Sequence, residues 1–185
     1  IEGDLVEAII QMPTDLFYNT GISTYIWVLT KGKTMQRSGR VQLIDASKCY
    51  VKRRKNIGNK RVDLDDACIR LILRAYEGFA DETCEESGLI AESKVFDNRF
   101  FGFTKVTVET AQTDEHGKPI LKKGKKQPVK GATDTEIIPL SEDIDAYMEK
   151  NVLPYNPLAY IDHAKDKIGY EVPFTRLFYQ FVPPT

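Results

Sequence analysis

The chain lacks an excess of charge of either sign, is poor in cysteine and histidine, and has no long apolar run. Its formal net charge is −1, so only the distribution of charge along the chain bears on nucleic-acid binding. The three cysteines, Cys49, Cys68 and Cys84, lie far apart, and only His116 and His163 are available as further ligands, so we expect no metal site and no disulfide framework. Reduced thiols fit a cytoplasmic protein. No apolar run approaches the roughly 18 residues of a membrane span, so no membrane contact is expected.

The N-terminal segment carries the clearest pattern. Residues 5–12 form an apolar run of strand length, which Pro13 ends because proline has no N–H to donate to a strand ladder. Residues 24–29 are dense in β-branched and aromatic side chains. We therefore expect two buried strands joined by a loop that is longer than a hairpin needs, and loops of that length are often functional.

The loop between these strands carries two aromatic residues followed by small polar ones. Phe17, Tyr18, Asn19, Thr20 and Gly21 would place a rigid apolar platform beside hydrogen-bonding groups, on which a flat ring can stack. The alternative is that the two aromatic side chains plug the end of the sheet. Spacing alone favours this second interpretation.

A third strand and a helix follow. The segment 39–47 predicts a strand with Asp45 at its exit, and we favour a turn or capping role for this carboxylate over a ligand-binding one. Acidic residues at 63–66 suit a helix N-terminus, and the apolar stripe after them predicts a core-facing helix that stops at Gly78. Residues 80–92 are acidic and weakly patterned, which indicates a loop or a short helical turn.

A basic cluster lies between the third strand and this helix, in the segment 52–61, and consists of Lys52, Arg53, Arg54, Lys55, Lys60 and Arg61. Such a cluster can contact phosphates, because each neutralised phosphate releases condensed counterions. The alternative is a solvated loop whose charge balances the acidic residues just beyond it. Composition favours neither interpretation.

The C-terminal half is less regular. Residues 94–109 give an aromatic cluster followed by an alternating strand, which we expect to pack onto the preceding helix. The composition of residues 111–135 is typical of a mobile hairpin or a partly disordered loop. The functional alternative is that the basic run 122–126 contacts phosphates non-specifically. A second helix is expected to open at Ser141 as its N-cap and to end near residue 152.

The aromatic loop and its flanking strands resemble a segment of amino-methylating DNA methyltransferases, above all of the modification subunits of type I restriction-modification systems. In that family the pattern Leu-Pro-x-x-Leu-Phe-Tyr-x-Thr-Gly-Ile-x-Thr-x-Ile-Trp-Val-Leu follows the catalytic motif. The matching residues here, with Met12 in place of the usual leucine, are Pro13, Leu16, Phe17, Tyr18, Thr20, Gly21, Ile22, Thr24, Ile26, Trp27, Val28 and Leu29. The strand 39–47, the basic cluster and the tail 168–179 also resemble family segments.

The resemblance implies a fold and a division of the chain. It covers roughly residues 1–109 and 136–183, and implies an α/β fold with the C-terminal strands of a Rossmann-like, S-adenosylmethionine-dependent methyltransferase sheet and a mixed α+β extension. We expect residues 1–50 to belong to the methyltransferase domain and residues 51–185 to form the extension. Because Ile1 stands within a pattern that normally has a strand and a helix before it, we expect a fragment.

Two motifs of this family are missing from the chain. The catalytic Asn/Asp-Pro-Pro-Tyr/Phe is absent, since Tyr155-Asn156-Pro157-Leu158 lacks the second proline and the ring, and Val182-Pro183-Pro184-Thr185 lacks the amide and the ring. No glycine-containing strand-to-helix turn for S-adenosylmethionine is present either. We therefore expect no catalytic and no cofactor-binding residue here, and methylation of adenine N6 in DNA only by the full-length protein.

The resemblance also assigns roles and partners. The residues Phe17 to Gly21 would line the pocket of a flipped adenine, and the basic cluster would contact double-stranded DNA or another subunit. The tail would dock on the specificity subunit of a complex that also holds a restriction subunit, through Tyr170, Phe174, Arg176, Phe178 and Tyr179. The alternative, which the sequence favours equally, is that the tail folds back onto the core of its own chain.

Two other functions stay open on the sequence. One is a stand-alone nucleic-acid-binding module that uses residues 52–61 and 122–126. The other is a non-catalytic interaction domain that meets a partner subunit through residues 168–181.

Overall fold

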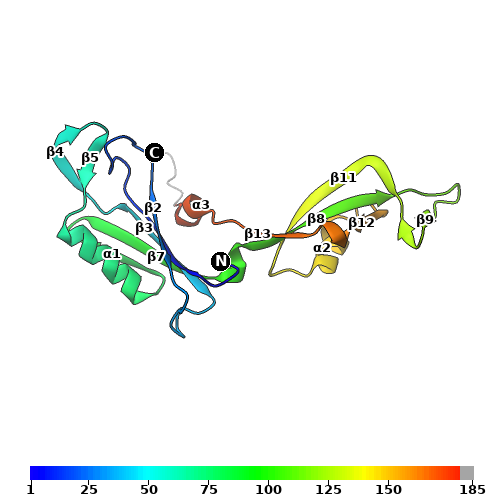
Figure 1. Cartoon of the computed structure of the whole chain (residues 1–185), viewed down its shortest axis with the longest axis horizontal. Helices are drawn as coiled ribbons and strands as arrows, with labels where there is room; N and C mark the ends of the chain where they lie inside the picture. The colour runs from blue at the N-terminus through cyan, green and yellow to red at the C-terminus, as the bar shows by residue number, and fades with distance from the viewer. Residues whose placement is uncertain (180–185) are drawn as a thin grey trace, which may run out of the picture. The chain divides into compact units, whose positions relative to one another are not determined.

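A computed structural model describes residues 1–179, which belong to two strand-rich, mixed α/β units (Figure 1). The first unit comprises residues 1–98 and the segment that starts at Pro173, and the second comprises residues 99–172. The expected boundary between a methyltransferase domain (residues 1–50) and an extension (residues 51–185) is a different division of the chain, and it stays a prediction. Among the described residues, no helix combines the length and the hydropathy that a bilayer crossing requires.

The first unit is built on a five-stranded sheet in the order β2-β1-β3-β7-β6. Its strands are β1 (Val6–Gln11), β2 (Tyr25–Leu29), β3 (Arg40–Lys48), β6 (Glu82–Glu86) and β7 (Leu89–Asp97). β1 runs parallel to β3 and antiparallel to β2, and β7 is antiparallel to both β3 and β6. The strands predicted over 5–12, 24–29 and 39–47 are thereby confirmed.

One face of this sheet is covered by α1 (Asp66–Gly78), as the apolar stripe predicts. The Asp65 carboxylate caps the helix by accepting a hydrogen bond from the Cys68 N–H at 2.9 Å. The helix buries Leu71 and Ala75 against a core that includes Ile10 and Ile44 of the sheet. The opposite face carries α3 (Phe174–Phe178) (Figure 1).

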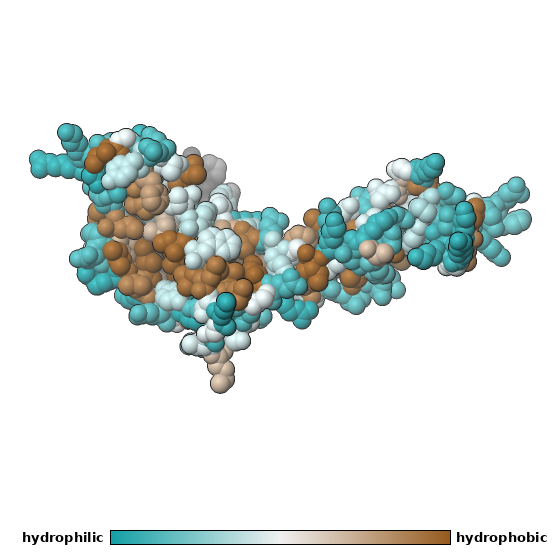
Figure 2. Space-filling model, in the orientation of Figure 1, coloured by the Kyte–Doolittle hydropathy of each residue, from teal (hydrophilic) through white to brown (hydrophobic). Residues whose placement is uncertain are grey.

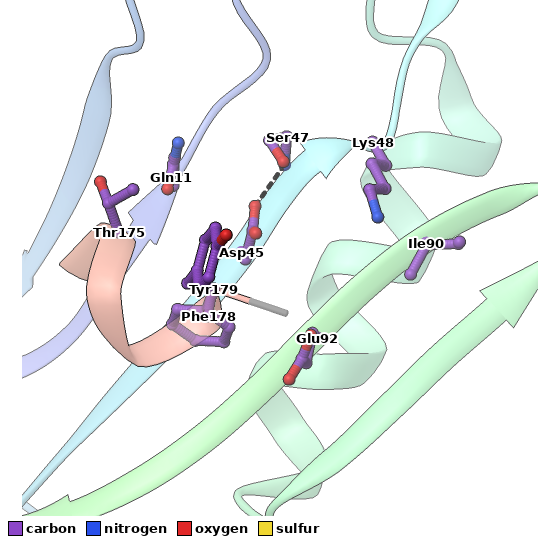
Figure 3. Close-up of a pocket in the computed structure, with 9 residues that line it drawn as sticks. All are labelled: Gln11, Asp45, Ser47, Lys48, Ile90, Glu92, Thr175, Phe178 and Tyr179. Carbon is purple, nitrogen blue, oxygen red and sulfur yellow. Dashed lines mark hydrogen bonds between the residues drawn. The ribbon is translucent and has the colours of Figure 1, made fainter. Parts of the chain in front are cut away.

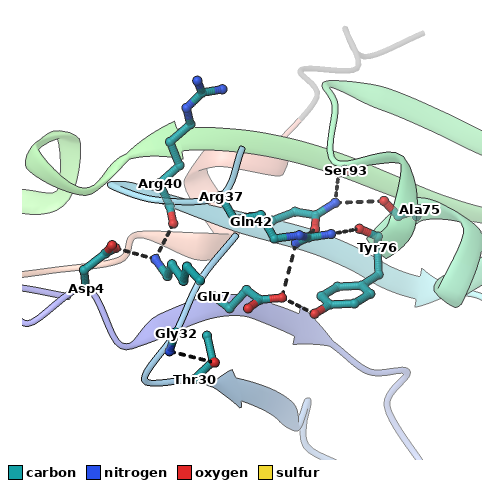
Figure 4. Close-up of polar contacts among 11 residues, drawn as sticks. Asp4, Glu7, Thr30, Gly32, Arg37, Arg40, Gln42, Ala75, Tyr76 and Ser93 are labelled. Atoms are coloured by element: carbon teal, nitrogen blue, oxygen red, sulfur yellow. Dashed lines mark hydrogen bonds and ion pairs between the residues drawn. The ribbon is translucent and has the colours of Figure 1, made fainter. Parts of the chain in front are cut away.

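A buried polar cluster ties β3 and α1 together (Figure 4). Gln42 is fully buried, and its amide donates to the Ala75 carbonyl and to the Ser93 hydroxyl, both at 2.8 Å. Arg37 donates to the Gln42 side-chain oxygen at 3.1 Å, and its guanidinium carbon lies 4.3 Å from the Tyr76 ring centroid. Because each buried polar group has a hydrogen-bond partner, the cluster fixes the position of α1 on the sheet and does not destabilise the fold.

Three expectations for the first unit are wrong. β2 is not a buried strand, because it lies at the edge of the sheet and exposes 49% of Ile26 and 56% of Trp27. The basic cluster does not lie in a loop but on a two-stranded hairpin, β4 (Val51–Ile57) with β5 (Lys60–Asp63). Residues 80–92 form most of the β6–β7 hairpin, in which β6 is an edge strand and buries only Cys84.

The second unit is organised around β8 (Gly102–Ala111), which follows a short turn of 3-10 helix, η1 (Asn98–Phe101). β8 pairs on one side with β11 (Pro128–Pro139) and on the other with β12 (Ala159–Ile161) and β13 (Lys167–Tyr170), all antiparallel. α2 (Ile144–Asn151) packs Met148 onto Val106 and Ile138, and η2 (His163–Lys165) follows β12.

The expectations for this unit are confirmed in part. The alternating strand is present as β8, but it joins the sheet of the second unit instead of packing on α1. The second helix begins two residues later than expected, because Asp143 and not Ser141 caps it, accepting from the Ala146 N–H at 3.0 Å. The segment 111–135 is a hairpin structure, with β9 (Leu121–Lys122) and β10 (Lys125–Lys126) before β11.

Candidate nucleic-acid interface

The aromatic loop between β1 and β2 is a compact, hydrogen-bonded turn. Asp15 takes a left-handed backbone conformation with φ 57°, and Phe17 and Thr20 form a short antiparallel bridge. The Phe17 and Tyr18 side chains are 48% and 56% exposed, so they do not plug the end of the sheet. The interpretation that spacing favoured is therefore wrong, and two aromatic surfaces are available to a flat ligand.

The loop rests on the basic hairpin. The Tyr18 carbonyl accepts a hydrogen bond from the Asn59 N–H, and the Asp15 carbonyl accepts one from the Arg61 N–H, each at 2.9 Å. The Lys60 ammonium lies 5.5 Å from the centroid of the Tyr18 ring. The structure thus brings together two of the predicted site segments, residues 17–21 and 52–61, in one surface.

Gly58 makes this close approach possible. Its φ is +58°, and a Cβ atom built there would lie 2.7 Å from the Tyr18 carbonyl oxygen. Glycine adopts this left-handed backbone conformation readily, and it has no Cβ atom that would collide with the Tyr18 carbonyl oxygen. The sequence carried a signal for the hairpin turn in Gly58-Asn59, but no signal that the turn would hold the aromatic loop.

The charges of the hairpin fall into two groups. Arg53 and Lys60 pair with Asp63 at 2.5 and 2.9 Å, and hydrogen bonds from Lys60 and then from Arg53 lower the pKa of that carboxyl. The remaining cations are exposed and form no ion pair within residues 1–179; they are Lys52, Arg54, Lys55 and Arg61. Within the cluster, charge balance therefore applies to Arg53 and Lys60, and phosphate contact is open to the four exposed cations.

The residues expected to dock on another subunit are divided in the structure. Phe174 and Phe178 are buried, and their rings stack with centroids 4.9 Å apart. The Phe174 ring also meets the edge of Tyr25 at 5.3 Å, so these two side chains pack on their own sheet. Arg176 and Tyr179 are exposed, and Tyr170 is half-buried on β13. Residues 180 and 181, also expected at that interface, lie outside the described part of the chain.

A cleft of about 340 Å³ opens at the carboxyl ends of β1 and β3, beside α3 (Figure 3). Gln11, Asp45 and Ser47 line one side, and Glu92 and Phe178 the other. The Asp45 carboxylate accepts a hydrogen bond from the Ser47 N–H at 2.8 Å, a local contact inside β3 where its pairing with β7 shifts register, so Asp45 does not mark the exit of the strand as expected. Lys48 also lines the cleft, and Lys94 pairs with Glu92 at 3.1 Å, so cationic and anionic groups occur together there.

The cysteines are buried and unpaired. Burial raises the pKa of the Cys49 thiol to about 12, and the neighbouring Cys68 adds to this effect. The thiol is therefore protonated at neutral pH and is not a nucleophile.

The structure thus places an exposed aromatic loop on a basic hairpin, within a mixed α/β unit. A family model for N-6 DNA methylases matches residues 1–116, and the chain belongs to this family. The match includes the aromatic loop and the basic hairpin.

The relatives of the chain are named as methylase subunits of type I restriction enzymes. The chain is 36% identical over 81 residues to the MjaVIII type I restriction enzyme methylase subunit of Methanocaldococcus jannaschii, and the aligned region covers 44% of this chain and 14% of the relative. It is 33% identical over 86 residues to the MjaVII methylase subunit of that organism, again covering 44% and 14%. The chain is also similar to the solved type I methyltransferase subunit of Streptococcus thermophilus, with 29% identity over 50% of this chain and 17% of that one, and a TM-score of 0.36. The chain thus spans a small part of the length of the proteins that it matches.

Proposed function

We propose that the chain is the C-terminal part of a type I modification subunit, which in the complete protein transfers a methyl group from S-adenosylmethionine to adenine N6 in DNA. The observation that carries this proposal is the pair of half-exposed aromatic side chains, Phe17 and Tyr18, on a loop that the basic hairpin holds. Membership of the N-6 DNA methylase family supports the reaction class.

The free edge of β2 supports a position after other strands of the same sheet. Among residues 1–179, β2 pairs with β1 alone and exposes large apolar side chains, including Ile26, Trp27 and Leu29. Leu5, just before β1, is 46% exposed as well. An apolar, uncovered edge strand favours pairing with a further strand.

The strand-to-helix turn before α1 does not fit the cofactor. In the first unit, the strand-to-helix turn before α1 holds Leu64 and Asp65 instead of glycine, and the Asp65 carboxylate already occupies the helix N-terminus. A negative charge and side chains at this turn exclude the close approach that a nucleotide-like ligand needs. In the proposal, S-adenosylmethionine is bound by another part of the complete subunit.

The chain's own contribution is to position DNA. Phe17 or Tyr18 stacks on the adenine that has left the duplex, and Asn19 and Thr20 offer hydrogen-bonding groups beside the ring. The exposed cations Lys52, Arg54, Lys55 and Arg61 contact phosphates beside that base. The exposed Arg176 and Tyr179 contact the specificity subunit, and the restriction subunit completes the complex.

The proposal is tested by methylation of duplex DNA by the complete subunit with its specificity subunit. Stacking of a base on an aromatic side chain is worth about 1–3 kcal/mol, so Phe17→Ala or Tyr18→Ala should lower kcat/KM roughly 5- to 150-fold. The matched control is Tyr155→Ala, which removes an aromatic side chain that is 87% exposed in the second unit. Full activity of both loop variants would contradict the proposal.

A further inference from the structure

The positive charge of the second unit is gathered in one segment. Residues 118–130 hold six lysines and no acidic residue, whereas the rest of residues 99–172 holds five Lys or Arg and twelve Asp or Glu. The segment includes the β9–β10 hairpin, at the far end of this unit from η1 (Figure 1). That end is mostly hydrophilic in Figure 2, although Ile120, Leu121 and Val129 are exposed in the segment. A polyanion near this unit is therefore attracted to the hairpin and repelled elsewhere.

The β9–β10 hairpin is hydrogen-bonded, and its strands and turn carry four of these lysines. Lys123 and Gly124 form its turn with φ of 51° and 78°, and Lys122 lies opposite Lys125 in the register. At its base the Gln127 N–H donates to the Ile120 carbonyl at 3.0 Å. The backbone positions of the lysines are thus fixed, so no backbone ordering is needed when the exposed side chains bind.

The neighbouring carboxylates are already neutralised by other groups. The Glu109 carboxylate accepts from the Lys165 ammonium at 2.7 Å and from the Tyr160 hydroxyl at 2.9 Å, and these contacts lower its pKa. Lys165 also pairs with Asp162 at 3.1 Å. Within residues 1–179 no ion pair engages the hairpin lysines, and all are exposed: Lys122, Lys123, Lys125 and Lys126.

A groove of about 480 Å³ runs along the base of the hairpin. Lys125, Lys126 and Tyr160 line it, together with the carboxylates of Glu109 and Asp162, both of which pair with Lys165. The Lys126 ammonium lies 5.3 Å from the Tyr160 ring centroid, and the Lys126 carbonyl oxygen lies 3.2 Å from the Tyr160 hydroxyl oxygen, whose proton is directed to Glu109. These contacts anchor the hairpin to β12 and fix the side of the groove that carries the lysines.

We propose that this lysine hairpin is a second, sequence-independent contact with the backbone of double-stranded DNA. Lysine is depleted in the centres of protein–protein interfaces, whereas rows of ammonium groups suit phosphate oxygens, so the chemistry favours a nucleic-acid backbone over a protein partner. The choice of DNA rests on the proposed function; the hairpin itself is independent of the adenine loop.

The test is fluorescence anisotropy of the 185-residue chain with a short labelled duplex of arbitrary sequence, measured over a series of salt concentrations. The double variant Lys122→Gln/Lys125→Gln removes two contacts, so the binding constant should fall about tenfold and the salt slope should decrease by about two. Lys150→Gln/Lys167→Gln is the matched control, because both of its lysines are exposed in the same unit and lie outside the hairpin. It should leave the salt slope unchanged.

Three outcomes would overturn the inference: a wild-type chain that does not bind the duplex at low salt, a hairpin variant with the salt slope of the wild type, or tighter binding to duplex RNA. A parallel variant, Arg54→Gln/Lys55→Gln, separates the two proposals. Loss of binding there with an unaffected lysine-hairpin variant would retain the proposed function and reject the second contact. The altered residues are exposed, so circular dichroism should show unchanged folding for every variant.

Discussion

Gln42 is the buried residue on which the polar contacts of the first unit converge. It is fully buried and bonded to Arg37, Ala75 and Ser93. Gln42→Ala would leave these groups without their partner and open a cavity, so we expect the free energy of unfolding to fall by about 2–4 kcal/mol. Urea denaturation measures this change. Gln36→Ala, at an exposed position, is the control and should alter stability by less than about 0.5 kcal/mol.

Asp4 makes the first unit sensitive to acid. Burial alone would raise its pKa, but hydrogen bonds from Lys33, the Gly39 N–H and Asn98 lower the pKa from 3.8 to about 2. Because the folded-state value is the lower one, the stabilisation is complete above about pH 4 and is lost as the pH falls toward 2.

Asp4→Asn should therefore be less stable than the wild type at pH 7, by about 1 kcal/mol, and should lose less stability between pH 4 and 2. Thermal unfolding at a series of pH values measures both effects. Lys33→Met removes the 2.6 Å ion pair from the other side and should flatten the same part of the profile. Parallel pH profiles for the wild type and both variants would contradict this role of the ion pair.

At the scale of elements, the contact between the aromatic loop and the basic hairpin depends on Gly58. Gly58→Ala introduces strain at a positive φ and also a Cβ atom 2.7 Å from the Tyr18 carbonyl oxygen. Gly88→Ala introduces comparable strain, because its φ is +83°, but meets no atom within 4 Å. We expect Gly58→Ala to be the more destabilising by about 1 kcal/mol, the value of a lost hydrogen bond.

Hydrogen exchange distinguishes loss of this contact from a general loss of stability. In Gly58→Ala the Asn59 and Arg61 amides, which donate to the loop, should exchange faster than in Gly88→Ala at equal global stability. Equal exchange rates in the two variants would show that the loop does not depend on the hairpin turn.

β1, β3 and α1 were predicted because each buries one continuous apolar set. β2 is exposed, and it was predicted because its residues are β-branched and aromatic. β6 was missed because an edge strand with Glu82, Glu85 and Glu86 buries only Cys84, which leaves no apolar alternation to detect. The turn Ser87-Gly88, with φ of 53° and 83°, was the one local signal of that hairpin.

At the scale of the whole molecule, the candidate site was predictable by segment but not by contact. Resemblance singled out residues 17–21 and 52–61 separately, but no local pattern shows that the Asn59 amide meets the Tyr18 carbonyl. The burial of Phe174 and Phe178 was likewise open, because an aromatic tail suits a partner subunit and its own sheet equally well.

In the proposed function, the chain supplies DNA-positioning residues to a subunit whose cofactor site lies elsewhere. The decisive experiment is calorimetry with S-adenosylmethionine, on the 185-residue chain and on a version extended upstream to include the catalytic and glycine-containing motifs. We expect no binding heat for the chain alone and one-to-one binding for the extended protein. Binding of S-adenosylmethionine by the chain alone would refute the proposed function, because the cofactor site would then lie within these residues.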